Sequence, residues 1–324
     1  MIGILFTGGT ISMRFDPATG AAVPALSAAE ILAEVPDLQS VGEIEIEEFA
    51  RMPGPHVTPE QMWRLARRAA AWLERPDVDG LVITHGTDTI EETAYFLNLV
   101  VKSRKPVVLT AAMRPSTALS ADGPLNFYNA VAVAANKDAA GRGVLVVVND
   151  WIHGASSLTK TSTTAVQTFL SPVSGLIGTV AYGTPEWYRG PVGKNTASSE
   201  FAVDKNTVLP RVDIIMASEN MDGALINAAA AAGAKGIVIA GVGNGNMTKA
   251  ALDALAAQAK KGIVAVRSSR VATGQVGRNV EVDDDKMGFV ASLGHNPQKS
   301  RVLLRVALLK TSDPKAIQRY FDEY

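Results

Sequence analysis

Two hydroxyl-bearing segments stand out because each directly follows an apolar run. Residues 7–11 read Thr-Gly-Gly-Thr-Ile after the run 2–6, and residues 84–89 read Thr-His-Gly-Thr-Asp-Thr after the run 81–83. Glycine lets a backbone approach a ligand closely, and a threonine hydroxyl can serve as a nucleophile. Open parallel sheets place their ligand crevice at the carboxyl ends of strands, where both segments are expected. A plain Gly-Gly turn is the alternative for residues 8–9.

A helix start offers a purely structural reading of the second segment. Asp88 with Glu91, or Thr89 with Glu92, matches a capping box, in which side chains satisfy free backbone N–H groups. That reading does not exclude function, because a helix N-terminus also stabilises developing negative charge.

Three further segments carry residue types that could do chemistry. Ser157 and Lys160 match an S-x-x-K pattern, but the companion motifs are absent and a solvated loop is the alternative. The run 241–246, Gly-Val-Gly-Asn-Gly-Asn, departs from the dinucleotide fingerprint, so we expect a tight βα turn. Residues 281–285, Glu-Val-Asp-Asp-Asp, are expected to form a solvated acidic turn without metal, since they lack the glycine and distal glutamate of a calcium loop.

Other hydrolytic chemistries lack their residues. The four histidines form no zinc-binding pair, and no G-x-S-x-G motif is present. The chain has no cysteine, which excludes a disulfide, a thiolate zinc site and a cysteine nucleophile. Hydrolysis would therefore use a hydroxyl nucleophile without histidine as its evident base.

Short apolar runs alternating with helical patterns predict an α/β protein with parallel strands buried between helices. The expected strands are 2–6, 44–49, 81–84, 107–110, 144–148, 212–216, 237–240 and 263–266. The expected helices are 59–74, 89–101, 125–136, 224–232, 249–261 and 296–310.

Length and composition predict two domains. The 324 residues exceed the usual size of a single core, and between residues 187 and 210 the periodicity fades into Gly, Pro, Asn, Ser and Lys. We therefore expect a larger domain over 1–190, a linker over 191–211 and a smaller domain over 212–324.

A net charge of -1 argues against nucleic-acid or membrane partners and favours a small ligand. The N-terminus lacks a signal-peptide pattern, so we expect a cytoplasmic location.

Taken together, the segments 7–11 and 83–89 resemble the paired signatures of the bacterial-type asparaginase and glutaminase family. The resemblance covers essentially the whole chain. It continues through residues 112–116, 120–123, 158–161, 240–246 and 296–299.

The resemblance implies a larger N-terminal α/β domain with a mainly parallel sheet, a smaller C-terminal parallel-sheet domain, and a homotetramer built as a dimer of intimate dimers. It implies a cofactor-free L-asparaginase whose nucleophile is Thr10 and whose second triad is Thr87, Asp88 and Lys160. It also implies that Asp88 binds the substrate's α-ammonium group, while Asn246 and Glu281 come from the neighbouring subunit.

Two departures from the family pattern bear on mechanism and preference. The family's mobile loop usually carries a tyrosine, yet residues 12–29 contain none, and Ala22 lies nearest that place. The carboxylate-binding segment often reads Gly-Ser-Gln, but residues 54–56 here read Gly-Pro-His. Pro55 offers no N–H and no hydroxyl, so His56 or neighbouring backbone is expected to hold the carboxylate.

Three rival readings remain open at this point. One is a glutaminase-asparaginase of broad amide preference, since one methylene gives little discrimination. Another is a non-catalytic amino-acid-binding protein on the same fold, which the missing tyrosine favours. The third, a nucleotide-binding oxidoreductase, rests only on the imperfect glycine run.

Overall fold

The computed structural model describes residues 1–16 and 18–324, and it describes no side chain for Ala22, Pro24 or Pro36. The chain divides into two compact units, Met1–Lys205 and Asn206–Tyr324. The division falls inside the segment 191–211 that we expect to be a linker. Among the described residues, no helix is both long and apolar enough to cross a membrane.

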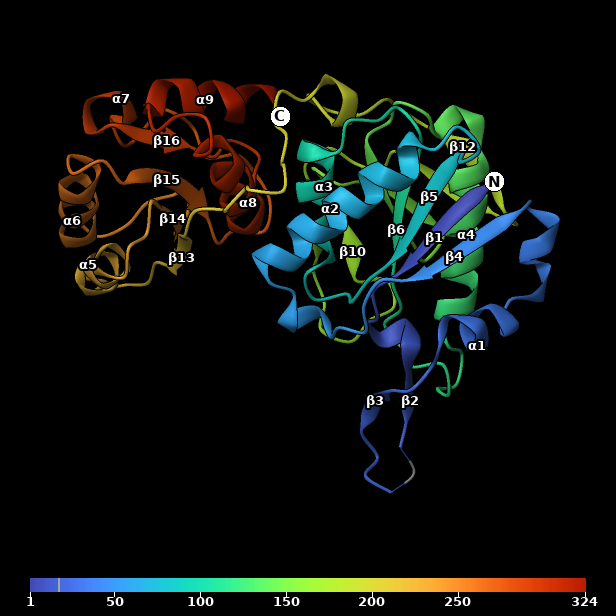
Figure 1. The fold of residues 1–324 in the computed structure, drawn as a ribbon. Coiled ribbons are helices and arrows are strands. Elements are labelled where there is room, and N and C mark those ends of the chain that lie inside the picture. The colour runs from blue at the N-terminus through green and yellow to red at the C-terminus, as the bar shows by residue number, and fades with distance from the viewer. Residues whose placement is uncertain (17) are drawn as a thin grey trace. The chain divides into compact units, whose positions relative to one another are not determined.

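The first unit is built on an eight-stranded mixed sheet with strand order β12-β11-β8-β7-β6-β5-β1-β4 (Figure 1). Parallel pairing joins β4 (Ile44–Glu48), β1 (Ile2–Phe6), β5 (Gly80–Thr84), β6 (Val107–Thr110) and β7 (Val144–Val148). Antiparallel pairing then adds β8 (Trp151–Gly154), β11 (Gly178–Ala181) and β12 (Thr184–Trp187). The predicted parallel strands are confirmed, and the antiparallel edge is an addition to them.

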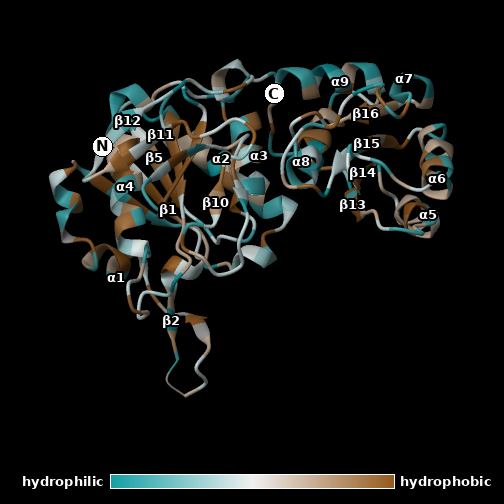
Figure 2. Ribbon diagram, turned by 180° about the vertical axis from the view of Figure 1, so that it is seen from behind, coloured by the Kyte–Doolittle hydropathy of each residue, from teal (hydrophilic) through white to brown (hydrophobic). Residues whose placement is uncertain are grey.

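Helices cover both faces of this sheet. On one face, Phe127 and Val131 of α4 (Gly123–Ala135) share a core with Val82 and Val108 of the central strands. On the other face, a Cβ added to Gly3 would lie 2.5 Å from the ring of Trp72, which belongs to α2 (Pro59–Glu74). The helix α3 (Ile90–Val100) packs beside α2. Burial on both faces explains why these strands read as continuous apolar runs, the brown strands of Figure 2.

Smaller elements complete the first unit. The helical ones are α1 (Ala28–Ala33), η1 (Thr10–Ser12), η2 (Pro36–Ser40), η3 (Gly54–His56), η4 (Lys137–Ala139) and η5 (Thr196–Ser198). Two small antiparallel pairs are β2 (Met13–Phe15) with β3 (Ala22–Pro24), and β9 (Thr159–Lys160) with β10 (Phe169–Leu170).

The second unit has a four-stranded parallel sheet in the order β13-β14-β15-β16. Its strands are β13 (Val212–Met216), β14 (Gly236–Gly241), β15 (Val264–Ser269) and β16 (Phe289–Ala291). Its helices are α5 (Ala224–Ala231), α6 (Lys249–Ala259), α7 (Asp284–Met287), α8 (Pro297–Ala307) and α9 (Pro314–Glu323). The expected α/β architecture with a smaller parallel-sheet domain is thus confirmed.

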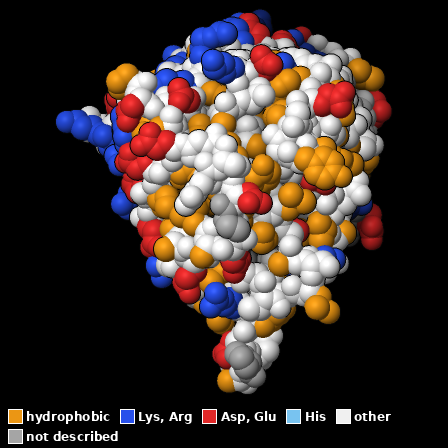
Figure 3. All heavy atoms as spheres, turned by 90° about the vertical axis from the view of Figure 1, so that its right-hand side faces the viewer, with side chains coloured by type: hydrophobic (Ala, Val, Ile, Leu, Met, Phe, Trp, Pro, Cys, Tyr) orange, Lys and Arg blue, Asp and Glu red, His pale blue; other side chains and the backbone are white. Residues whose placement is uncertain are grey.

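The side chains on one face of the molecule do not form a field of one charge. On the face shown in Figure 3, Lys and Arg side chains alternate with Asp and Glu. This mixture agrees with the net charge of -1 and with the expectation of a small ligand.

Candidate active site

Three loops meet at the carboxyl edge of the first sheet, where β4, β1 and β5 end side by side. Glycines make the contacts between them. A Cβ added to Gly9 would lie 2.6 Å from the backbone nitrogen of Gly86, and one added to Gly86 would lie 2.7 Å from Cα of Gly54. Real Cβ atoms do not approach backbone so closely, so the loops can pack this way only because side chains are absent. Residues 9, 54 and 86 therefore form a glycine stack that brings the predicted segments together.

Buried threonines lock the first two loops. The Thr7 hydroxyl donates to the Thr84 carbonyl oxygen at 2.6 Å, and the Thr7 N–H donates to the Thr84 hydroxyl at 3.3 Å. Both side chains are buried. The Met52 N–H in turn donates to the Thr7 carbonyl at 2.8 Å, which ties in the loop after β4.

Thr10 begins η1 immediately after the stack. Its predecessor Gly9 has a φ of 89°, a left-handed conformation that favours glycine. The Ser12 hydroxyl donates to the Gly9 carbonyl oxygen at 2.8 Å and so fixes the turn. Thr10 is half-buried, which leaves its hydroxyl able to meet a small ligand.

Lys160 of β9 reaches the loop after β5. Its ammonium group donates to the Thr87 hydroxyl at 2.9 Å and to the Asp88 carboxylate at 2.7 Å. The Lys160 side chain is 18% exposed and that of Asp88 is 54% exposed, so the pair faces solvent through its acidic member. The structure thus brings together Thr87, Asp88 and Lys160, and the contact between Gly9 and Gly86 sets this cluster beside Thr10.

The capping-box prediction for this loop is wrong. Thr89 is the N-cap of α3, but its side chain makes no capping hydrogen bond. Its hydroxyl instead donates to the Gly54 carbonyl oxygen at 2.7 Å. A partner in the loop after β4 outcompetes the local backbone, so Thr89 holds the segment 54–56 against the site.

The Ser157–Lys160 pattern is not a Ser-Lys nucleophile in the structure. The Ser157 hydroxyl is hydrogen-bonded to that of Ser174, while Lys160 points to Thr87 and Asp88. The solvated-loop alternative for Lys160 is also wrong, because most of its side chain is covered.

The segment 54–56 forms η3 and offers few backbone donors. Pro55 has no N–H, and the N–H of His56 donates to the Pro53 carbonyl at 3.0 Å. Pro55 and His56 are both exposed. Because the backbone N–H of His56 is already engaged, its imidazole is the remaining donor of this pair.

His85 fixes the backbone of the loop after β5. Its ring Nδ1 lies 2.8 Å from the Gly86 carbonyl oxygen, which can only accept, so Nδ1 carries the proton. Burial holds the pKa of His85 below its usual value, although the bond to Gly86 acts in the opposite direction. The neutral ring therefore orients the backbone just before Thr87.

The second unit brings together the two residues expected from a neighbour. The Asn246 side-chain amide donates to the Glu281 carboxylate across 35 positions of sequence. Glu281 is exposed and Asn246 is half-buried. The run 241–246 is a tight turn after β14, closed by backbone hydrogen bonds between Val242 and Asn246, as expected.

The prediction of a solvated acidic turn at 281–285 is wrong for one residue. Asp284 is fully buried, and its carboxylate pairs with Arg267 of β15 at 2.6 Å. Glu281, Asp283 and Asp285 are exposed. Among the described residues, no group of three or more potential ligands could hold a metal ion.

Two family models match the chain. "Asparaginase, N-terminal" covers residues 1–193, and "Glutaminase/Asparaginase C-terminal domain" covers residues 211–321. The chain belongs to the asparaginase family.

Relatives across their full lengths agree with this family assignment. The chain is 50% identical to "Probable L-asparaginase periplasmic" of Haemophilus influenzae, covering 100% of this chain and 93% of that protein. It is 43% identical to "Glutaminase-asparaginase" of Pseudomonas fluorescens, covering 99% and 90%. A crystal structure titled "Probable Cytoplasmic L-asparaginase" from Campylobacter jejuni superposes with a TM-score of 0.93 at 45% identity, covering 100% of this chain and 99% of that one.

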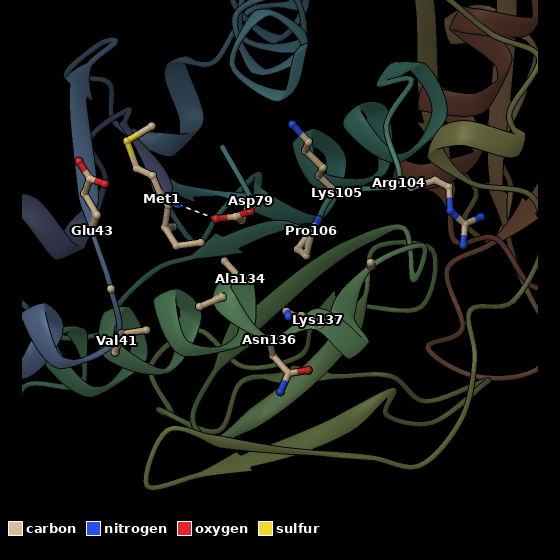
Figure 4. A pocket seen from close by; sticks show the side chains of 14 residues that line it. Met1, Val41, Glu43, Asp79, Arg104, Lys105, Pro106, Ala134, Asn136 and Lys137 are labelled. Carbon is tan, nitrogen blue, oxygen red and sulfur yellow. Dashed lines mark hydrogen bonds and ion pairs between the residues drawn. The ribbon is translucent and has the colours of Figure 1, made fainter. Parts of the chain in front are cut away.

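A separate pocket lies at the opposite, amino-terminal edge of the same sheet (Figure 4). Its lining includes Asp79, whose carboxylate accepts a hydrogen bond from the Met1 amino group at 2.5 Å, together with Lys105 and Lys137. The described residues that line this pocket include no serine, threonine, histidine or tyrosine. It therefore lacks the hydroxyl chemistry that the glycine stack assembles at the other edge.

Sequence reasoning missed the residues that hold the loops rather than face a ligand. These are Thr7, Thr84, His85, Thr89, Arg267 and Asp284. The one usable signal was that Thr7 and Thr84 each follow or end an apolar strand, which puts their hydroxyls at the same sheet edge. Partner choice for the others depends on tertiary contacts.

Proposed function

We propose that this chain is an L-asparaginase that releases aspartate and ammonia through Thr10. One observation carries the proposal: Lys160 bridges Thr87 and Asp88 on a loop whose Gly86 touches the residue before Thr10. Two threonine-bearing loops thus adjoin each other, as the attack on one carboxamide requires. Membership of the asparaginase family supports the same reaction.

In the first half-reaction, the Thr10 oxygen attacks the side-chain amide carbon of asparagine. The hydroxyl proton ends on the amide nitrogen, the carbon–nitrogen bond breaks, and ammonia leaves. A β-aspartyl ester of Thr10 remains. Water then attacks the ester carbon, the Thr10 oxygen regains a proton, and aspartate is released.

Lys160 serves proton movement in this scheme. After it has given up a proton, the Lys160 amine can take one up from the Thr87 hydroxyl that it contacts, and the Asp88 carboxylate stabilises the ammonium that results. Backbone N–H groups at the strand ends can stabilise the developing oxyanion. The chemistry needs no cofactor and no metal.

Substrate recognition divides between the two ends of the free amino acid. Asp88 binds the α-ammonium group, with Asn246 and Glu281 of a neighbouring subunit completing that contact. The His56 imidazole binds the α-carboxylate, since Pro55 and the engaged His56 N–H supply no backbone donor. A homotetramer built as a dimer of intimate dimers would supply the neighbour.

A cytoplasmic location belongs to the same proposal. The names of relatives point both ways, since one is called periplasmic and one cytoplasmic. Fractionation of the native host, with detection of the chain, decides between them.

The first test is ammonia release from L-asparagine and L-glutamine, measured side by side for the parent, Thr10→Ala and Thr10→Ser. We expect strong asparagine activity in the parent, its loss in Thr10→Ala and partial retention in Thr10→Ser. Equal rates with both amides would favour the broad glutaminase-asparaginase, which the relative from Pseudomonas fluorescens makes a specific alternative. Binding of asparagine without hydrolysis by the parent would favour the non-catalytic reading.

A further inference from the structure

The second unit contains an ion pair that is entirely buried. Arg267 of β15 and Asp284 of α7 both have 0% side-chain exposure. Two parallel hydrogen bonds join them, from Nε to Oδ1 at 2.6 Å and from Nη2 to Oδ2 at 2.8 Å. Both side chains are thereby fixed in a single geometry.

The remaining donors of Arg267 grip two loops at once. Nη1 donates to the carbonyl oxygens of Asn244 at 3.0 Å and Gly245 at 3.3 Å, and Nη2 donates to that of Gly277 at 3.0 Å. Asp284 Oδ2 also accepts the Asn279 N–H at 2.9 Å. One guanidinium–carboxylate unit therefore holds the turn after β14 and the loop that leads into α7.

A side chain adds a direct link between the same loops. The Asn244 amide oxygen accepts the Gly277 N–H at 2.8 Å. A Cβ added to Gly245 would lie 3.2 Å from Arg267 Nη1, so the backbone rests directly on the guanidinium. Asn246 follows on one loop and Glu281 on the other, and these two side chains are hydrogen-bonded to each other.

Stability alone is a poor reason for such a pair. Removing two charges from water costs as much as their attraction returns, and apolar replacements of buried pairs are often neutral or stabilising. What apolar residues could not reproduce is the set of four hydrogen bonds to loop backbone.

We propose that Arg267, with Asp284 and Asn244, positions the Asn246–Glu281 pair for recognition of the substrate's α-ammonium group. Arg267 is a positioning residue that touches no substrate. The inference rests on the proposed function, in which that pair binds substrate.

A positioning role of this kind has a kinetic signature. The α-ammonium group keeps its charge throughout the reaction, so its contacts are equally strong in ground state and transition state. Loosening them raises KM and leaves kcat nearly unchanged. We expect KM for L-asparagine to rise about tenfold, the loss typical of one hydrogen bond to a charged group.

The experiment uses the full-length enzyme and two independent variants. Asn244→Ala removes the link between loops without leaving a buried charge. Arg267→Met combined with Asp284→Leu replaces the ion pair by apolar side chains of similar size, which should preserve the fold. Gln318→Met is the matched control. Buried Gln318 also bonds backbone, at Ala291 of β16 beside Arg267 in the sheet, but its hydrogen bonds go to Ala291 and Asp322 and reach neither loop. KM, kcat and the thermal midpoint are measured for each.

A double-mutant cycle separates the positioning role from the proposed function. Each variant is also made in an Asn246→Ala, Glu281→Gln background. Support requires about a tenfold rise in KM in the parent, less than twofold in that background, and an unchanged KM for Gln318→Met.

Three outcomes overturn the inference. An equal rise in both backgrounds shows action through other groups. A second outcome is that KM stays parental in the Asn244 and Arg267–Asp284 variants although Asn246→Ala, Glu281→Gln raises it. That result shows that the loops stay positioned without Asn244, Arg267 and Asp284. If that background has a parental KM, the assignment of Asn246 and Glu281 in the proposed function is itself wrong.

Discussion

Replacing Lys160 by methionine distinguishes a catalytic lysine from a structural one. The substitution keeps the apolar stem and removes the ammonium that contacts Thr87 at 2.9 Å and Asp88 at 2.7 Å. Because the Asp88 side chain is 54% exposed, the pair is screened by solvent and contributes at most about 1 kcal/mol to stability. If Lys160 moves protons, kcat should instead fall by about 10²- to 10⁴-fold. That fall corresponds to about 3–5 kcal/mol of lost transition-state stabilisation, well above the stability effect.

The assay is steady-state ammonia release from L-asparagine, with thermal unfolding followed on the same samples. Lys249→Met is the matched control, since Lys249 makes an ion pair of the same 2.7 Å length with Asp253 on the surface of α6. We expect parental kinetics for the control and a nearly unchanged unfolding midpoint for both. A Lys160→Met enzyme with kcat within threefold of the parent would refute the proton-transfer role.

Three further changes test other parts of the molecule. Gly9→Ala should lower kcat more than 100-fold in a protein that still folds, because the new Cβ would lie 2.6 Å from the backbone nitrogen of Gly86. Gly20→Ala is the control, since Gly20 also has a positive φ but has no neighbour within 4 Å of an added Cβ. Equal loss of activity in both variants would contradict the packing explanation. His56→Ala should raise KM for asparagine about tenfold with kcat nearly constant, because one charge-assisted hydrogen bond to the substrate carboxylate is lost. An unchanged KM would show that other groups bind the carboxylate. Burial lowers the pKa of His153 from 6.5 to about 3, so its neutral form contributes stability that is complete above pH 6.5 and is lost as pH falls toward 3. His153→Gln, which cannot titrate, should therefore show a shallower fall of unfolding free energy between pH 6 and pH 4 in chemical denaturation, by up to about 1.4 kcal/mol per pH unit, and parallel curves would count against this histidine as a source of acid sensitivity.

The sequence predicts the buried strands well, because a continuous apolar run indicates burial on both faces of a sheet. The runs that form β1, β6 and β7 are apolar except for Thr110 at the end of β6, and the structure buries each on both faces. Elements with weaker patterns were missed, including the antiparallel strands β8, β11 and β12. Residues 184–187 of β12 are half-buried or exposed at the sheet edge, so no apolar run marks them.

The candidate site divides in the same way. Thr10, Thr87, Asp88 and Lys160 could be proposed from motifs that resemble the family's, and the structure brings the last three together. The contacts of Thr89 and Asp284 could not be predicted, because the sequence favours a helix cap at Thr89 and a solvated turn at Asp284. Each instead binds a group 35 or 17 positions away, Gly54 or Arg267, and only the folded chain supplies those partners.

The glycine stack separates the geometry of the reacting groups from the lining of the substrate space. Backbone-to-backbone contact at Gly9, Gly54 and Gly86 sets the spacing between the loops. A side chain added at any of these positions would displace the loops. The adjoining Pro55 and His56 are exposed and take no part in the glycine stack, so replacing them leaves the spacing between the loops unchanged. We therefore expect substitutions at these two positions to alter substrate binding while the spacing of the threonine loops stays constant.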